Sequence, residues 1–427
     1  MTQHRHTALR RGAFIAIPVA GALVLAGCSG SGDEGDSGST GFSFTYATSN
    51  NLESPYEALA NAYMEANPGV DIELNPQPND NYDTTVRTQL QAGNATDIIQ
   101  TVPGAGQPRS VVELAEAGFL APLGDASAAI ISEGTENLFQ VDGETYGQPV
   151  DFTVTGIVAN LTTAQDAGVD EFPDDFNAFL DACADVAASG KSMVALAGAA
   201  APNTGLMAMS ISATRVYAET PDWNEQRAAG DTTFAESEGW QDTLQTVIDM
   251  HEAGCFQPGA EGGGFDAITN GLAGGTSIAA FAPGGSAVEI AQAAPEGVQF
   301  MIEPFPADNS DAFILASSNY SLSITEGSEN QEAAQDFLDW VAGAEGAQIF
   351  ADASGQLPVK GYEELELEGT VYESSAELLT SGAYAPLPNT IWPNASVYDA
   401  LASGVQGLLT GQNTIDDVLS AMDAAWG

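Results

Sequence analysis

Basic residues and histidine are scarce in this chain of 427 residues. It contains 9 Lys and Arg against 59 Asp and Glu, and its formal net charge is -50 at pH 7. We expect neither nucleic acid nor anionic lipid heads as partners, because a surface this acidic repels both. His251 is the only histidine after residue 28. This excludes a His-rich metal site, and a Ser-His-Asp relay would have to use His251 as its base.

Catalytic and nucleotide-binding signatures are also missing. The sequence has no Gly-x-Ser-x-Gly elbow, no His-Glu-x-x-His, no Gly-x-x-x-x-Gly-Lys and no Cys-x-x-Cys. The chain has so many carboxylates that two of them lying close together would not indicate a glycosidase. We therefore predict a protein that is not an enzyme and needs neither metal nor cofactor.

No apolar run reaches the roughly 20 residues that cross a membrane. A shorter run over about 13–25 follows three arginines and has the layout of a secretory signal. The Leu-Ala-Gly-Cys that ends at Cys28 resembles the lipobox of bacterial lipoproteins. That resemblance implies lipidation of Cys28, whereas the alternative is an ordinary signal peptide that contains a cysteine. The export route, general or twin-arginine, stays open.

The resemblance divides the N-terminal region into two parts. Residues 1–27 are predicted to be a signal peptide, and residues 28–41, rich in Gly, Ser and acids, a flexible linker. The predicted location is extracytoplasmic, with the protein held at the outer face of the cell membrane by its lipid anchor alone.

The remaining chain alternates short apolar strands with amphipathic helices. Phe42 to Thr48 reads as a strand, and Ser54-Pro55-Tyr56-Glu57 opens a helix with a capping box. Tyr146 to Asn160 reads as one extended stretch that crosses between lobes, and Ser286 as the cap of a later helix. This alternation predicts α/β layers with largely parallel sheets.

Two cysteines follow Cys28. Cys183 lies on the apolar face of a predicted helix, and Cys255 follows the glycine that ends another helix. An even pair in an exported protein predicts a disulfide, with two buried free thiols as the alternative.

Five segments, taken in order, resemble a known family. They are 63–72, 93–99, 146–149 followed by Asn160, 330–346 followed by 354–359, and 411–419. The order is similar to that of the extracellular solute-binding proteins of bacterial ABC importers, in the carbohydrate-type branch (family 1). In the second segment Thr96 replaces the common proline.

The resemblance implies a periplasmic-binding-protein-like fold of two α/β lobes. Each lobe is expected to hold a mixed, mostly parallel sheet flanked by helices, with the ligand cleft between lobes that close by a hinge. The expected first lobe comprises 42–151 and about 276–316. The expected second lobe comprises about 152–275 and 317–427. The implied partners of this monomer are a small solute, a permease and its ATPase.

Candidate ligand contacts come from loops expected to face the cleft, although capping or turn chemistry explains the polar ones equally well. They are Ser49, Asn50, Gly104, Asp151, Thr153, Asn203, Thr204, Gly284, Gly285, Ser286, Trp392 and Tyr398. Sugar sites combine hydrogen-bonding side chains with aromatic rings that stack on pyranose faces. The loop at Gly284 and Gly285 lacks an aromatic that many oligosaccharide binders of this family carry.

The leading hypothesis is a lipid-anchored receptor for a mono- or oligosaccharide. The alternatives are a receptor of the same fold for a non-sugar solute, a secreted glycosidase and a structural or adhesive lipoprotein.

Overall fold

The computed structural model describes residues 40–48, 54–132, 134–308 and 311–427. All of them belong to one compact unit, Ser39–Gly427. The expected signal peptide, Cys28, nearly all of the linker, Ser49 and Asn50 lie outside the described residues. Within the described ranges, no helix is both long and apolar enough to cross a membrane.

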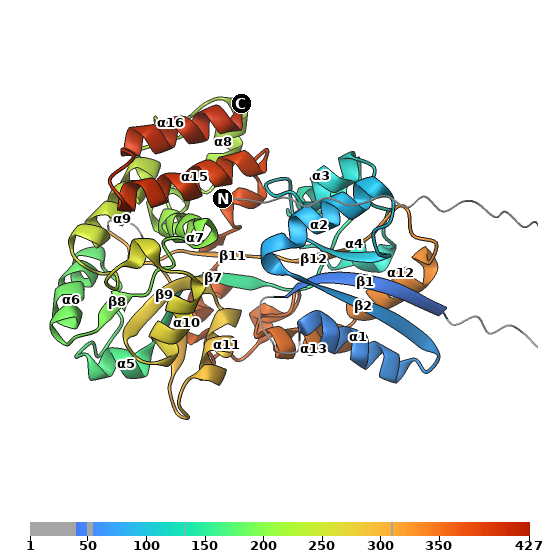
Figure 1. Cartoon of the computed structure of the whole chain (residues 1–427), viewed down its shortest axis with the longest axis horizontal. Coiled ribbons are helices and arrows are strands. Elements are labelled where there is room, and N and C mark those ends of the chain that lie inside the picture. Colours follow the sequence, from blue (N-terminus) through green and yellow to red (C-terminus); the bar gives the residue numbers. More distant parts are fainter. Residues whose placement is uncertain (1–39, 49–53, 133, 309–310) are drawn as a thin grey trace, which may run out of the picture. The chain divides into compact units, whose positions relative to one another are not determined.

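The first sheet has five strands in the order β2-β1-β3-β12-β6 (Figure 1). Their bounds are β1 (Thr40–Thr48), β2 (Val70–Pro78), β3 (Ile98–Thr101), β6 (Gln148–Pro149) and β12 (Ser321–Ile324). β1 pairs in parallel with β2 and β3, and β12 is antiparallel to β3 and β6. A hairpin of β4 (Gln140–Val141) and β5 (Glu144–Thr145) stands apart and turns at Asp142 and Gly143, both with positive φ.

Helices cover both faces of this sheet. They are α1 (Pro55–Ala66), α2 (Asn79–Ala92), α3 (Val111–Glu116), α4 (Asp125–Ala129), α12 (Gln331–Val341) and α13 (Ala344–Ser354). Ser54 caps α1 and Pro55 occupies its first turn, as predicted. The aromatic core between the sheet and α1, α12 and α13 includes Phe44, Tyr56 and Phe337. α2 and α3 cover the other face with a smaller apolar cluster.

The second sheet runs β13-β11-β7-β9-β8, and β10 also pairs with β7. Its strands are β7 (Thr153–Asn160), β8 (Ser192–Val194), β9 (Ser277–Pro283), β10 (Phe300–Glu303), β11 (Ile314–Ser317) and β13 (Tyr384–Ala385). β7 is buried along its whole length and is antiparallel to β9, β10 and β11. The sheets are therefore mixed, and the expectation of mostly parallel pairing is wrong for the second one.

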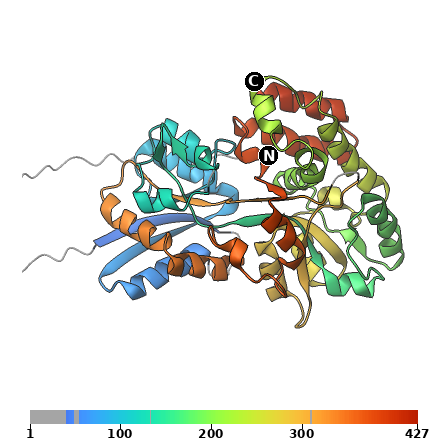
Figure 2. The ribbon, with the colours of Figure 1, turned by 180° about the vertical axis from the view of Figure 1, so that it is seen from behind.

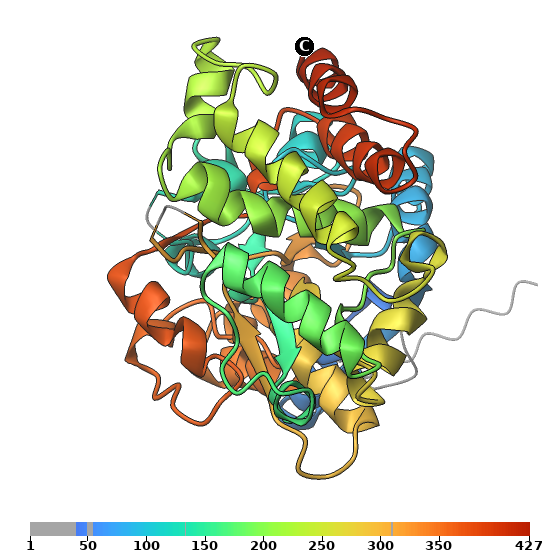
Figure 3. The same cartoon turned by 90° about the vertical axis from the view of Figure 1, so that its left-hand side faces the viewer.

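Two groups of helices pack on the second sheet (Figures 2 and 3). The larger core includes α6 (Phe176–Ala188), α7 (Ala201–Ser212), α9 (Glu238–Glu252), α15 (Ala395–Leu409) and α16 (Ile415–Trp426). The smaller one includes α10 (Phe265–Ala273), α11 (Gly285–Ala293) and α14 (Ala376–Ser381). Also present are α5 (Leu161–Asp166), α8 (Trp223–Ala229), the π turn Ala213–Tyr217, and the 3-10 turns Glu136–Leu138, Ala260–Gly262, Tyr362–Glu364, Glu373–Ser375 and Pro388–Thr390. A disulfide joins Cys183 of α6 to Cys255 after α9.

Three segments cross between the sheets. Residues 150–152 join β6 to β7, residues 318–320 join β11 to β12, and residues 355–356 lead from α13 to Leu357, which bridges Phe152. We call residues 40–149 and 321–354 the first lobe, and residues 153–317 and 357–427 the second lobe.

Strand pairing corrects the expected lobe boundaries. β9, β10 and β11 lie in the second sheet beside β7, and β12 lies in the first sheet beside β3. The expected assignment of 276–316 to the first lobe and of 317–427 entirely to the second is therefore wrong. The chain returns to the first lobe only at β12 and leaves it again after α13. The crossing expected within Tyr146 to Asn160 is confirmed, because β6 and β7 belong to different sheets.

Candidate functional site

A cleft of about 260 Å³ is lined by both lobes and by two crossing segments. The first lobe contributes Ala47, Thr48, Ser54, Pro55, Tyr56, Gln100, Phe350, Ala353 and Ser354. The second lobe contributes Pro283, Gly285, Ser286, Val288, Glu289 and Gln292, and the crossings contribute Tyr320 and Gln356. The volume lies just below the range usual for small-molecule sites, which suits a compact solute.

Aromatic rings form one wall of the cleft. Tyr56 and Phe350 stand edge to face, with ring centroids 5.3 Å apart, and Tyr46 packs behind Tyr56 at 5.7 Å. The Tyr56 hydroxyl is buried and has no hydrogen-bond partner among the described residues. Burial raises the pKa of this phenol well above its ordinary value, so it stays neutral. A neutral phenol both donates and accepts, which fits a polar solute.

The polar face of α11 forms the opposite wall. Ser286, Glu289 and Gln292 are three residues apart and therefore share one side of the helix. The helix begins at Gly285 with Gly284 as its N-cap, and no side chain caps it. The predicted capping role of Ser286 is therefore wrong, since Ser286 lies inside the first turn and lines the cleft.

Gly284 and Gly285 allow α11 to start close to the third crossing. A Cβ at Gly284 would lie 2.6 Å from Cε1 of Tyr372, and a Cβ at Gly285 would lie 2.6 Å from the carbonyl oxygen of Ser354. Larger residues would push the helix away from the crossing segment. Gly285 lines the cleft, whereas Gly284 packs beneath Tyr372.

Gln100 brings an amide to the cleft from the middle sheet strand β3. Its Oε1 accepts from the Ala47 N–H at 2.8 Å, and its backbone carbonyl accepts from the Tyr82 hydroxyl at 2.7 Å. The first bond holds the side-chain amide and the second holds the backbone, and Gln100 is 2% exposed. With Oε1 engaged, the Nε2 donor is the group left for a solute.

Asp151 and Thr153 lie behind the cleft and not among its lining residues. The Asp151 carboxylate accepts from the Thr153 hydroxyl and from the N–H groups of Asn319 and Tyr320, at 3.2 and 3.0 Å. Burial raises its pKa to about 6, although these hydrogen bonds oppose the rise. The predicted solute contact at Asp151 is replaced by contacts within the crossing segments.

Gly104 joins the two lobes at a different place. Its N–H donates to the Leu138 carbonyl at 2.8 Å, and a Cβ here would lie 1.7 Å from the carbonyl oxygen of Thr390. The neighbouring Ala105 N–H donates to that same oxygen at 3.4 Å. Gly104 therefore makes a backbone contact between lobes outside the cleft lining.

The structure places Asn203, Thr204 and Trp392 in the interior of the second lobe, and Tyr398 lies half-buried at the edge of the same core. Asn203 bonds the Ala197 N–H and the Phe281 carbonyl, and the Thr204 hydroxyl donates to the Ala402 carbonyl. The Tyr398 hydroxyl donates to Pro202 O at 2.8 Å.

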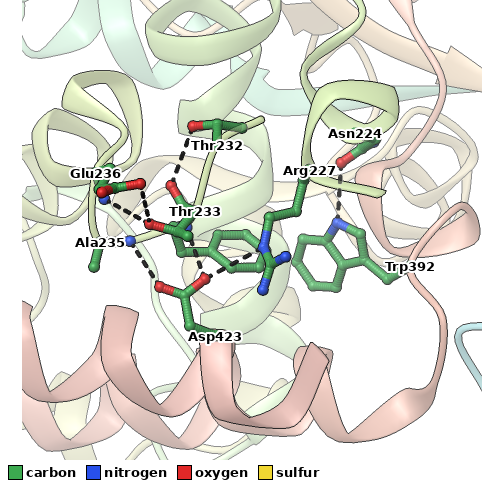
Figure 4. Close-up of polar contacts among 9 residues, drawn as sticks. Asn224, Arg227, Thr232, Thr233, Ala235, Glu236, Trp392 and Asp423 are labelled. Atoms are coloured by element: carbon green, nitrogen blue, oxygen red, sulfur yellow. Dashed lines mark hydrogen bonds and ion pairs between the residues drawn. The ribbon is translucent and has the colours of Figure 1, made fainter. Parts of the chain in front are cut away.

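Trp392 is fully buried, and its indole N–H donates to Asn224 Oδ1 at 3.2 Å (Figure 4). These contacts explain all four residues by packing, and none of the four lines the cleft.

Sequence reasoning missed most of the lining. Glu289 and Gln292 could have been found, because they repeat the face of Ser286 on a helix that was correctly expected. Tyr56 lies in the predicted capping-box segment at the start of α1, so its sequence context supplies a structural reason for it and no indication that it lines the cleft. Gln100, Tyr320 and Phe350 gave no signal, because their position depends on which strands pair.

Charge in the cleft is of one sign. Glu289 is the only Asp, Glu, Lys or Arg among its lining residues in the described ranges. Arg109, whose charge acts on Tyr56 and Tyr320, is held by Asp83 at 3.4 Å and lies over the Tyr82 ring at 5.0 Å. The described residues contain no group of three or more His, Cys, Asp or Glu that could hold a metal ion.

Comparison with known proteins gives one family match and many structural matches. Residues 47–348, well over half of the chain, match the family model described as bacterial extracellular solute-binding protein. No curated protein sequence matches.

Similar solved structures include a chitin oligosaccharide binding protein, with TM-score 0.75, 19% identity, and coverage of 90% of this chain and 98% of the other. Another comes from work on xylan utilization by Caldanaerobius polysaccharolyticus, with TM-score 0.73, 19% identity, and coverage of 90% and 99%. The GacH receptor of Streptomyces glaucescens, solved without ligand and with acarbose, gives TM-score 0.69, 18% identity, and coverage of 90% and 97%. At these identities the likeness establishes the two-lobed fold.

Proposed function

Since the chain belongs to the bacterial extracellular solute-binding protein family, we propose that it is the receptor of an ABC importer and captures a carbohydrate between its lobes. The observation that carries the proposal is the cleft itself, in which aromatic rings of one lobe face hydroxyl and amide groups of the other. Pyranose rings offer apolar faces for stacking and hydroxyl edges for hydrogen bonding, so this pairing suits a sugar. The similar structures include a chitin oligosaccharide binding protein and complexes with raffinose and with acarbose, which support the same class of solute.

Capture proceeds by closure of the lobes about the three crossings. A solute that touches Tyr56 on one lobe and Ser286 on the other stabilises the closed arrangement more than the open one, which is the condition for shifting that equilibrium. The permease then receives the solute from the closed receptor. Ser49 and Asn50, next to lining residue Thr48, remain proposed contacts.

The charge of the cleft narrows the solute. Glu289 disfavours uronic acids and sugar phosphates, because like charges repel and Glu289 is the charged side chain among the described residues that line the cleft. We therefore propose a neutral or amino sugar. Glu289→Gln is expected to narrow the difference in affinity between galactosamine and galacturonic acid by severalfold, measured by calorimetry on both sugars.

Calorimetry on the protein without its signal and lipid tests the proposal. The panel contains raffinose, acarbose, xylotriose, chitotriose, galactose and tagatose. We expect at least one to bind, and Tyr56→Ala to weaken that binding by tenfold or more through loss of a stacking ring. Gln292→Ala should weaken it less, and Gln245→Ala, on the exposed face of α9, should leave it unchanged. Binding of an amino acid, peptide or polyamine with no sugar bound would overturn the carbohydrate assignment.

Anchoring at Cys28 is a separate proposal. A lipid there, followed by the Gly- and Ser-rich stretch, would hold the receptor at high effective concentration beside its permease. One acyl chain anchors weakly, so stable attachment needs more than one. Cys28→Ser should release the protein into the medium with sugar binding intact, and retention of that variant in washed membranes would contradict the lipid anchor.

A further inference from the structure

The first two crossing segments form a single two-stranded ribbon with a break in its middle. Ser321 lies opposite Pro149 on the first-lobe side, and Ser317 lies opposite Thr153 on the second-lobe side. Both pairs belong to the same antiparallel register, so continuous pairing would place Asp151 opposite Asn319. Regular strands stop at Pro149 and Ser317 and resume at Thr153 and Ser321. The break is where the ribbon passes from one lobe to the other.

A side chain supplies the missing acceptors at that break. Asp151 Oδ1 accepts from the N–H groups of Asn319 and Tyr320, at 3.2 and 3.0 Å, and Oδ2 accepts from the Thr153 hydroxyl. The Ser318 hydroxyl donates in turn to the Asp151 carbonyl at 2.6 Å. Each crossing segment therefore holds the other through Asp151, which is fully buried.

The same contacts reach the cleft through Tyr320. Its N–H is bound by Asp151, its carbonyl accepts from the Val150 N–H at 3.2 Å, and the residue lines the cleft. Asp151 therefore fixes the backbone of a cleft residue without touching the cleft itself.

We infer that Asp151 is a positioning residue, whose carboxylate couples the two crossing segments to Tyr320 so that solute affinity depends on whether the carboxylate is charged. The inference rests on the proposed binding function for its effect on affinity, but its structural part does not need a solute. A charged acceptor makes stronger hydrogen bonds than a neutral one, so protonation weakens the hold on both N–H groups.

The surroundings place this change at mild acidity. Burial raises the Asp151 pKa to about 6, and no lysine or arginine among the described residues forms an ion pair with it. The titratable groups that face it are Tyr56 of α1, Tyr320 of the second crossing and Tyr372, whose pKa values are all raised by burial and further by the Asp151 charge. These phenols stay neutral at mild acidity, and Arg109, which acts on Tyr56 and Tyr320, stays charged. Asp151 is then the titratable group hydrogen-bonded to both crossing segments, and the charge of Glu289 on α11 also acts on Tyr320, so the Asp151→Asn variant assigns the change to Asp151.

Nuclear magnetic resonance of the sugar-free protein tests the structural part. The amide signals of Asn319 and Tyr320 should titrate together with a midpoint near pH 6, and Asp151→Asn should abolish this titration. Thr153→Val removes a hydrogen bond that stabilises the carboxylate and should move the midpoint to higher pH, while Thr153→Ser should restore it. Ser318→Ala is the matched control, because its hydroxyl bonds the Asp151 carbonyl and leaves the carboxylate untouched.

Calorimetry tests the functional part with the panel sugar that binds most tightly. Wild-type affinity should fall about fivefold from pH 7.5 to pH 5, and Asp151→Asn should bind at pH 7.5 as weakly as wild type does at pH 5. Circular dichroism establishes whether each variant is folded. If Asp151→Asn does not fold, the pH dependence of sugar affinity is measured on Thr153→Val instead.

The outcomes separate the two proposals. Amides that do not titrate between pH 4.5 and 7.5 would overturn the inference. Titrating amides with no binding of any panel sugar would count against the proposed function alone. Titrating amides with the same affinity and pH profile in Asp151→Asn would overturn the link to the solute.

Discussion

Asp97 in the first lobe and Asp151 at the crossing both connect chain segments far apart in sequence, yet their pKa values move in opposite directions. Asp97 accepts from the Ser43 N–H and hydroxyl at 2.7 Å each, from the Ser328 hydroxyl at 2.6 Å, and from the Asn330 amide at 3.3 Å. Burial raises its pKa, but these bonds together lower it below the ordinary value. Asp151 has fewer donors and no exposure at all, so burial prevails.

The difference shows how one residue type serves two purposes. A carboxylate with enough donors at 8% exposure stays charged and stabilises a fixed junction. A fully buried carboxylate with three donors lies near the balance between its charged and neutral forms. The first suits a fixed junction within a lobe, and the second suits the crossing segments, about which we propose that the lobes move.

The largest expected effect comes from removing the better-bonded carboxylate. Asp97→Ala removes the charged acceptor of the Ser43, Ser328 and Asn330 donors, and hydrogen bonds to a charged group are worth about 1.5–3 kcal/mol each. We expect the free energy of unfolding at pH 7 to fall by about 3 kcal/mol, measured by urea denaturation. Asp185→Ala, on the exposed face of α6, is the control and should change it by less than about 0.5 kcal/mol. A loss at Asp97 as small as the control's would remove the basis of the comparison.

The opposite pKa directions predict opposite pH dependences. Asp151, whose folded pKa is raised, contributes stability that is present below about pH 4 and lost as the pH rises through about 6. The free energy of unfolding of Asp151→Asn minus that of wild type should therefore rise by about 2.5 kcal/mol from pH 4 to pH 7.

The matched variant at the other carboxylate should give the reverse sign. Asp97, whose folded pKa is lowered, contributes stability that is present above the unfolded pKa and lost as the pH falls through the folded one. The difference between Asp97→Asn and wild type should shrink below pH 4. Urea titrations at several pH values measure both, and parallel curves for the two variants would contradict the assigned directions.

Sequence periodicity could predict individual helices and strands, but neither the boundaries of the lobes nor the contacts at their junction. The helix at Ile415–Trp426 and the cap at Ser54 follow from residues within one or two turns, so local patterns were sufficient. Asp151 was picked out because it lies at the crossover between the lobes, but its partners at Asn319 and Tyr320 lie 168 and 169 residues away. Only the strand register brings them together. Trp392 illustrates the opposite error, since an aromatic expected in the cleft fills a core with Phe234 and Trp240.

Removing a single hydrogen-bond donor from Asp97 or Asp151 should change the free energy of unfolding least, and the pH dependence of that change should differ between the two carboxylates. Ser328→Ala removes one of the bonds that hold the Asp97 carboxylate charged, so its pKa should rise toward the ordinary value. One hydrogen bond to a charged group is worth about 1.5 kcal/mol at most here, because Ser43 and Asn330 still donate. We expect a loss of about 1 kcal/mol at pH 7 that narrows as the pH falls through the lowered pKa of Asp97, because the carboxylate then becomes protonated in both proteins. Thr153→Val, the corresponding change at Asp151, should instead cost more as the pH rises through 6. A cost of Ser328→Ala that stays the same from pH 7 down to a pH at which Asp97 is protonated would mean that the serine acts through packing and not through the charge of Asp97.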